Sequence, residues 1–374
     1  INALSSTAGT NIKLEGSSNL TLGGGNTDTT IAGTISDSGS LTKTGTGTLT
    51  LSGNNTYTGT TTISAGILKL GHQNALGGTG AGTTIQSGAT LDLNGAYAGV
   101  SSNEAITVSG TGVAGNGAII NTGAAIVNSG FGNLTLAGDT TIGGSVRWDI
   151  RGGITFTGNN YTLTKAGSFQ IAVSSPLNGA DIVLNAGQFT IQTSNALGTD
   201  GTTTVNTGAT LNYFGTYTVP EKIIFNGGSL ASLNGVTTFS GPITLNTTTN
   251  VTTAAGGHNI TLSGVIDGAG GINKSGSSTL TFSGASANTY AGITTVQDGT
   301  LVLSKTAGVN AVAGNLVIGD SSGAAGSAIV QLAASDQIAN TSDVTIHSDG
   351  LLNVNSFNET IDALSQLDGV RRVH

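Results

Sequence analysis

Residues that commonly carry out enzyme chemistry are sparse in this sequence and stand far apart. Glycoside hydrolysis needs two carboxylates a few ångströms apart, yet the glutamates stand far apart in the sequence, at Glu15, Glu104, Glu221 and Glu359. The histidines have no metal-ligand spacing and no triad pattern; they are His72, His258, His347 and His374. No serine stands in a Gly-x-Ser-x-Gly elbow between a predicted strand and a predicted helix. The sequence therefore predicts no catalytic residue, no metal site and no cofactor.

The densest group of charged side chains is Arg147, Asp149 and Arg151, which alternate with apolar residues that include Trp148. In a strand, this alternation places Trp148 in the core and the three charged side chains on the opposite, outer face. One interpretation is a structural strand with a weak surface ion-pair ladder. The other is a recognition patch, formed by Arg147, Asp149 and Arg151, for an anionic or sugar ligand.

The composition predicts a folded chain rich in β-structure. Charged residues make up only 8%, whereas hydrophobic residues make up 37% and alternate with Thr, Ser and Asn. Glycine, with 61 residues, supplies corners between short strands. The net charge of −8 and the scattered Lys and Arg argue against nucleic acid as a partner. The sequence has no cysteine for a disulfide and no apolar run long enough for a membrane helix.

Short alternating segments recur about every ten residues and predict strands, with Leu, Ile or Val facing inward. They include Thr48–Leu51, Thr61–Ser64, Ile67–Leu70, Thr83–Gln86, Thr90–Leu93, Ile106–Val108, Leu134–Leu136, Val146–Ile150, Ile154–Phe156, Ile260–Leu262 and Leu301–Leu303. The Asn-Ala-Leu-Gly tetrads at Asn74 and Asn195 predict tight turns. In the segment 359–367, which could also be helical, we expect a strand at Thr360–Leu364.

One stretch of the sequence occurs more than once. Lys43 to Leu70 reads KTGTGTLTLSGNNTYTGTTTISAGILKL, and Lys274 to Leu303 repeats it with two extra residues. The copies extend over 39–95 and 270–319, and a partial copy occupies 182–214. Repetition at long spacing is typical of stacked structural units.

Two architectures fit such strands, a sandwich or barrel and a parallel β-helix. Corners of variable length around constant strand cores favour the β-helix, because insertions bulge outward without disturbing the stack. The sequence thus predicts an all-β, parallel β-helix, a single elongated rod of about 16 coils of about 23 residues each. We expect residues 1–374 to form one continuous β-helix and, since no Met stands at position 1, to come from a longer precursor.

The repeated pattern resembles the passenger-associated transport repeat of autotransporter proteins, also called the autotransporter-associated β-strand repeat. Lys43–Leu70 matches throughout, Ala186–Leu211 matches only the latter half, and Asn353–Ser365 is similar to another segment common in these proteins. The resemblance implies a right-handed parallel β-helix, a passenger domain that is exported across the outer membrane of a Gram-negative bacterium and lies outside the cell. It further implies an outer-membrane barrel on a part of the precursor absent here.

Three functions are compatible with these observations. The leading hypothesis is a cell-surface or secreted adhesin, stalk or spacer that makes multivalent, non-catalytic contacts with host-cell or surface glycans or proteins. A second hypothesis is a self-associating fibre or matrix module. The third is a carbohydrate-active β-helix enzyme, a lyase or a hydrolase.

Overall fold

The chain folds into stacked β-coils. The computed structural model describes residues 4–96, 104–127, 132–151 and 154–367, which contain no α-helix and a single 3-10 turn, Val113–Gly115. Two compact units divide at Phe189 and Thr190, and together they contain about 16 turns of a β-solenoid. The all-β parallel fold expected from the sequence is confirmed, and the sandwich is not.

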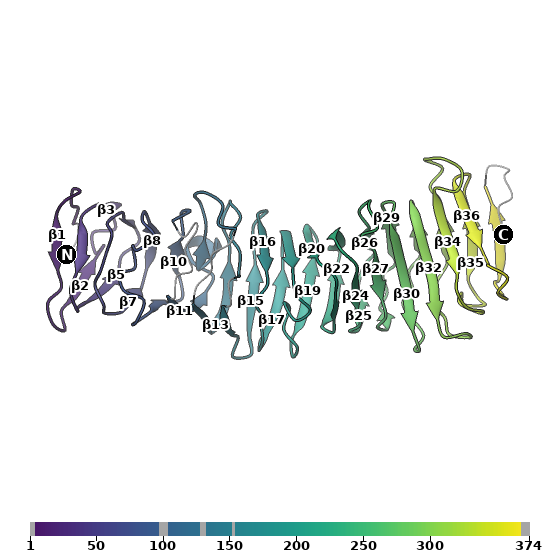
Figure 1. Cartoon of the computed structure of the whole chain (residues 1–374), viewed down its shortest axis with the longest axis horizontal. Helices are drawn as coiled ribbons and strands as arrows, with labels where there is room; N and C mark the ends of the chain where they lie inside the picture. Colours follow the sequence, from purple (N-terminus) through teal and green to yellow (C-terminus); the bar gives the residue numbers. More distant parts are fainter. Residues whose placement is uncertain (1–3, 97–103, 128–131, 152–153, 368–374) are drawn as a thin grey trace. The chain divides into compact units, whose positions relative to one another are not determined.

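In the first unit, residues 1–189, each coil passes three faces in turn, and strands of successive coils lie side by side (Figure 1). The first face contains β2 (Asn19–Leu22), β5 (Ser40–Lys43), β7 (Thr61–Ile63), β9 (Thr83–Ile85), β11 (Ala105–Gly110), the start of β13 (Asn133–Ile142) and β14 (Thr155–Thr157). The second contains β3 (Thr29–Ile31), β6 (Thr48–Leu51), β8 (Gly66–Leu70), β10 (Ala89–Asp92), β12 (Ile119–Ile120), the end of β13, β15 (Tyr161–Lys165) and β17 (Ala180–Leu184). The third is less regular and contains β1 (Asn11–Lys13), β4 (Thr34–Ser36), β16 (Gln170–Val173) and β18 (Gly187–Ile191).

The second unit, residues 190–374, also has three faces. One contains β19 (Thr202–Asn206), β22 (Lys222–Asn226), β25 (Ile243–Leu245) and β28 (Ile266–Asp267). The next contains β20 (Ala209–Phe214), β23 (Ser229–Asn234), β26 (Thr249–Thr252), β29 (Ile272–Ser275), β31 (Thr294–Val296), β33 (Leu316–Ile318), β35 (Asp343–Ile346) and β37 (Ala363–Gln366). The last contains β21 (Tyr217–Val219), β24 (Thr237–Phe239), β27 (Ile260–Leu262), β30 (Thr279–Gly284), β32 (Gly299–Lys305), β34 (Ala328–Leu332) and β36 (Gly350–Asn353).

Parallel pairing in register explains why coils of unequal length can stack. Thr48 pairs with Ile67, a spacing of 67 − 48 = 19 residues, whereas Leu316 pairs with Val344, a spacing of 344 − 316 = 28. These values bracket the expected 23 residues. The extra residues of a long coil lie in its corner loops, so the strands keep their register and like side chains form columns along the stack.

The core is aliphatic and follows from alternation within each strand. In β6 and β8, Leu49, Leu51, Leu68 and Leu70 are fully buried, while Thr50 faces outward. Register places Leu49 against Leu68 and Leu51 against Leu70 in the next coil. Each buried Leu contributes roughly 1.5–3 kcal/mol relative to an exposed one, so these columns supply much of the stability of the stack.

Two buried asparagines each join three successive coils. Asn55 accepts a hydrogen bond from the amide of Ile35 (2.8 Å) and donates one to the carbonyl of Ala75 (2.7 Å). Asn288 makes the equivalent bonds in the second unit, to Ile266 (3.0 Å) and Ala311 (2.8 Å). Both asparagines belong to the repeated sequence, and neither stands in a strand, so their side chains supply the coil-to-coil bonds at these corners.

The structure corrects two sequence-based expectations. Val146–Ile150 forms no regular strand, only isolated bridges of Trp148 with Ile126 and of Ile150 with Val173, because this face is irregular in the first unit. The last strand is Ala363–Gln366, not Thr360–Leu364, since Leu364 pairs with Val344. The tight turns at Asn74 and Asn195 are confirmed, with Gly77 and Gly198 donating back to them.

We predict that Asn55→Ala and Asn288→Ala each destabilise their unit by about 2–4 kcal/mol, because each change leaves a buried amide and a buried carbonyl without a partner. Urea denaturation would measure the change. Asn54→Ala is the matched control, since Asn54 is exposed and such surface changes usually cost under about 0.5 kcal/mol. Equal midpoints for Asn55→Ala and Asn54→Ala would contradict a joining role for Asn55.

Candidate binding surfaces

The most distinctive charged residues of the repeat, Lys43 and Lys274, are buried at coil corners and not available to a ligand. The Lys43 ammonium donates to the carbonyls of Thr44 (2.7 Å), Gly45 (2.9 Å) and Ala65 (3.0 Å). The Lys274 ammonium donates to the carbonyls of Gly276 (2.6 Å) and Asp298 (2.7 Å) and to the hydroxyl of Thr253 (3.1 Å). Each lysine therefore satisfies several corner carbonyls that no strand pairing reaches.

A glycine of the repeat makes room for each of these ammonium groups. Gly66 (φ 67°) and Gly299 (φ 66°) adopt left-handed backbone conformations at the following corner. A β-carbon would lie 2.7 Å from Lys43 Nζ at Gly66 and 2.8 Å from Lys274 Nζ at Gly299. The repeat thus combines a buried lysine with a later glycine that leaves space for the lysine's ammonium group.

A buried lysine also bonds corner carbonyls outside the full repeats. Lys165 donates to the carbonyls of Gly167 (2.9 Å) and Ala186 (2.7 Å), and its ammonium lies 4.1 Å from the centre of the Phe169 ring. Sequence reasoning did not identify these lysines as buried. The signal was present, because Lys43 stands two residues after Leu41, at an inward position of the alternation.

Burial lowers the pKa of these lysines. The pKa of Lys165 falls to about 8, and that of Lys274 falls to about 8 against a smaller opposing effect of Asp298. Burial also lowers the pKa of Lys43 and of Lys305. At neutral pH, Lys165 and Lys274 remain mostly protonated, as their bonds to carbonyl oxygens require.

The charged group Arg147, Asp149 and Arg151 forms a compact cluster around a buried carboxylate. Arg147 binds Asp149 through Nε (3.0 Å) and a terminal nitrogen (2.8 Å), and Arg151 Nε lies 3.3 Å from Asp149 Oδ2. Asp149 also accepts a hydrogen bond from the amide of Ala172 (2.9 Å). Asp149 is nevertheless 0% exposed, because the two arginines and the amide of Ala172 surround its carboxylate.

The two arginines of this cluster remain partly accessible, at 31% for Arg147 and 20% for Arg151. Arg151 additionally donates to the carbonyl of Val127 (3.1 Å). One carboxylate between two guanidinium groups leaves a net charge of +1. Trp148 is buried as expected, and its indole nitrogen donates to Gly143 (3.2 Å).

The outer surface of the first face carries an unbroken column of threonines, here called the threonine ladder. In seven successive coils the same outward position is threonine, and parallel strand pairing aligns each with the next: Thr21, Thr42, Thr62, Thr84, Thr107, Thr135 and Thr157. Their side chains are exposed or half-buried. Neighbouring hydroxyls follow the strand spacing of about 4.8 Å, so the ladder is a regular array of hydrogen-bonding groups.

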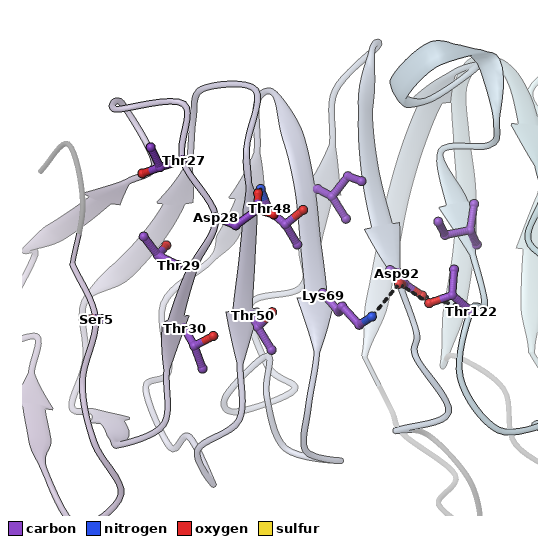
Figure 2. A pocket seen from close by; sticks show the side chains of 12 residues that line it. Ser5, Thr27, Asp28, Thr29, Thr30, Thr48, Thr50, Lys69, Asp92 and Thr122 are labelled. Carbon is purple, nitrogen blue, oxygen red and sulfur yellow. Dashed lines mark hydrogen bonds and ion pairs between the residues drawn. The ribbon is translucent and has the colours of Figure 1, made fainter.

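The second face of the same unit is hollowed into an open groove of about 770 Å³, here called the threonine groove. Figure 2 shows Thr30, Thr50, Lys69, Asp92 and Thr122 along it, each from a different coil. Lys69 lies 3.8 Å from Asp92, which accepts a bond from the Thr122 hydroxyl (2.6 Å). Sequence reasoning missed this groove, because strand pairing joins residues up to 30 positions apart.

A serine and a histidine of the second unit are in contact at a Gly-x-Ser-x-Gly sequence that lies in a loop. The segment 319–323 reads GDSSG, and Ser321 Oγ lies 3.1 Å from His347 Nδ1. A loop, not a helix, follows the serine, and the amide of Ser322 donates to Asp320 (2.9 Å). That amide is the one that would stabilise an oxyanion in a nucleophile elbow.

Within the described residues, no three or more His, Asp or Glu side chains are grouped so as to hold a metal ion. No helix within these ranges is long and apolar enough to cross a membrane. Arg371, Arg372 and His374, near the end of the sequence, lie outside the described residues.

We predict that the free energy of unfolding rises as the pH increases from about 8 to about 10. In this window Lys165 and Lys274 lose protons in the folded state, whereas unfolded lysine stays protonated up to its usual pKa of about 10.4, so the unfolded state binds more protons. The gain is absent below pH 8. Urea titrations between pH 7 and 10 would measure it, and a double Lys165→Met, Lys274→Met variant should show a flatter dependence. An unchanged slope in that variant would contradict the assignment.

Comparison with known proteins agrees with the architecture. The family model for the passenger-associated transport repeat matches residues 41–70 and 272–303, the segments that contain Lys43 and Lys274. No match was found among curated proteins or among solved structures. The chain therefore carries two passenger-associated transport repeats on a parallel β-solenoid, consistent with an autotransporter passenger that contains such repeats.

Proposed function

We propose that this chain is part of a secreted or surface-displayed passenger of a Gram-negative bacterium and acts as an adhesin, stalk or spacer. Its contacts are multivalent and non-catalytic, and its partners are glycans or proteins on a host cell or another surface. The observation that carries this proposal is the threonine ladder, which repeats one hydrogen-bonding group over seven coils. Many weak contacts of this kind can produce strong overall binding.

The location of the repeat residues supports the same proposal. Lys43, Asn55 and Tyr57 are all buried, as are Lys274, Asn288 and Tyr290. Tyr57 and Tyr290 each bond a threonine hydroxyl at 2.6 Å, Thr61 and Thr294 respectively. Because the buried positions of the repeat hold the coils together, contacts with partners fall to the outward side chains between these positions.

We predict that adhesion decreases in steps as ladder threonines are replaced by valine. Valine keeps the shape and the strand preference of threonine but lacks its hydroxyl. Variants with one, three or five of Thr42, Thr62, Thr84, Thr107 and Thr135 replaced would be displayed on beads, and bead binding to epithelial cells and to mucin would be counted. A single replacement should have little effect, and five should remove most binding. Full binding by the fivefold variant would contradict the multivalent role of the ladder.

The cluster of Arg147, Asp149 and Arg151 is proposed as an additional contact for anionic glycans, on the basis of its net charge of +1. Changing both arginines alone would leave a buried, unpaired carboxylate and destabilise the fold. The informative variant is therefore the triple change Arg147→Gln, Asp149→Asn and Arg151→Gln, which keeps polar side chains at all three positions and removes every charge. We expect it to lose retention on heparin while its melting temperature stays within a few degrees; unchanged retention would refute the patch.

A further inference from the structure

The threonine groove has the shape and the chemistry of a site for an extended ligand. We propose that it binds one strand of a neutral polysaccharide, oriented along the direction in which the coils of the first unit stack. This inference rests on the proposed function and specifies the ligand of one surface. It concerns a different face of the coils from the threonine ladder.

The groove continues over several coils. Its lining includes Thr30 of β3, Thr50 of β6, Lys69 of β8 and Asp92 of β10. A second hollow of about 310 Å³ shares Ile120 and Thr122 with it and continues towards Gly144 and Ala166. From β3 to β12 the four coil steps alone cover roughly 20 Å at about 4.8 Å per step. A depression of this length and openness suits a chain of sugars better than a single small molecule.

The threonines and charged side chains along the groove are regularly placed. Register puts Thr30 beside Thr50, Thr50 beside Lys69, and Lys69 beside Asp92. The hydroxyls of Thr30 and Thr50 have no hydrogen-bond partner within the described part of the chain, and both side chains face outward. A hydroxyl both donates and accepts, so this row can pair with the hydroxyl groups of successive sugar rings.

Apolar side chains complete the lining. Ile67 is half-buried on the outer surface of β8, and Ile120 of β12 lies further along the groove. Sugar rings present carbon–hydrogen faces as well as hydroxyls, and contact between these faces and isoleucine removes apolar surface from water. The combination of a few polar groups with apolar walls is the usual composition of a ligand site.

The charges of the groove select against anionic ligands. Asp28 and Asp92 contribute two carboxylates and Lys69 one ammonium, which gives a net charge of −1. Lys69 is already engaged with Asp92 at 3.8 Å, and Asp28 accepts a bond from the Thr48 amide (2.6 Å). Uronic acid or sulfated chains would place like charge beside Asp28. The favoured class is therefore neutral polysaccharide, in contrast to the anionic class proposed for Arg147 and Arg151.

Affinity electrophoresis of the full chain would test this inference. The gels would contain the neutral glycans laminarin, galactomannan or dextran, or the anionic glycans alginate or heparin. We expect at least one neutral glycan to retard the protein, and Thr30→Val with Thr50→Val to weaken that binding about tenfold, as the loss of two hydrogen bonds of about 0.7 kcal/mol each implies.

The matched control is the double variant Thr62→Val and Thr84→Val, which removes two hydroxyls from the threonine ladder on the neighbouring face. It should retain groove binding. Oligosaccharides of increasing length should bind the wild-type chain more tightly until the groove is filled. The inference is wrong if no neutral glycan retards the protein, if the control loses as much binding as the groove variant, or if only anionic glycans require Thr30 and Thr50. If any of these results is found but beads that carry the groove variant still adhere to cells, the inference about the groove has failed and the proposed function has not.

Discussion

The structure depends on the backbone hydrogen bonds that join each coil to the next in parallel register. Because register is kept while corner length varies from coil to coil, every strand position becomes a column along the stack. Inward columns become Leu and Ile ladders, as in Leu49 and Leu68, and outward columns become arrays such as the threonine ladder. One constraint thus produces both the core and the repeated surface, so a change in register would remove both together.

The corners are the weak points of this design, since polar backbone groups there are buried without strand partners. Buried polar groups that lack hydrogen bonds are costly, and the repeat supplies their partners. Lys43 and Lys274 serve three or more acceptors each, and Asn55 and Asn288 bridge three coils. The ammonium groups stay in place although burial lowers the pKa of Lys274 to about 8, because the surrounding carbonyls replace the lost water. The repeated sequence therefore supplies the hydrogen-bond partners that buried backbone groups at the corners need.

Alternation in the sequence was enough to predict strands such as β6 and β27, because that pattern is local. Lys43 stands two residues after Leu41 and therefore on the same, inward side of the strand, so its position was also predictable. A charged side chain is, however, normally expected on the surface. Asp149 could not be placed, since its burial depends on Arg147 and Arg151 folding over it on an irregular backbone. The threonine groove was beyond sequence reasoning for a different reason. Thr50, Lys69 and Asp92 meet only through register between coils of unequal length.

Buried repeat residues and exposed columns impose separate demands on the same chain. A substitution at Lys43 or Asn55 affects stacking, whereas one at Thr30, Thr50 or Thr84 alters only the surface, because valine, serine or asparagine also fits an outward strand position. Outward positions can therefore vary without loss of the fold, and the two faces of the first unit already differ in this way. The threonine ladder offers hydroxyls alone, while the threonine groove adds Lys69, Asp92 and apolar walls. Ligand preference in such a solenoid thus depends on which outward columns are changed, and stability depends on the corners.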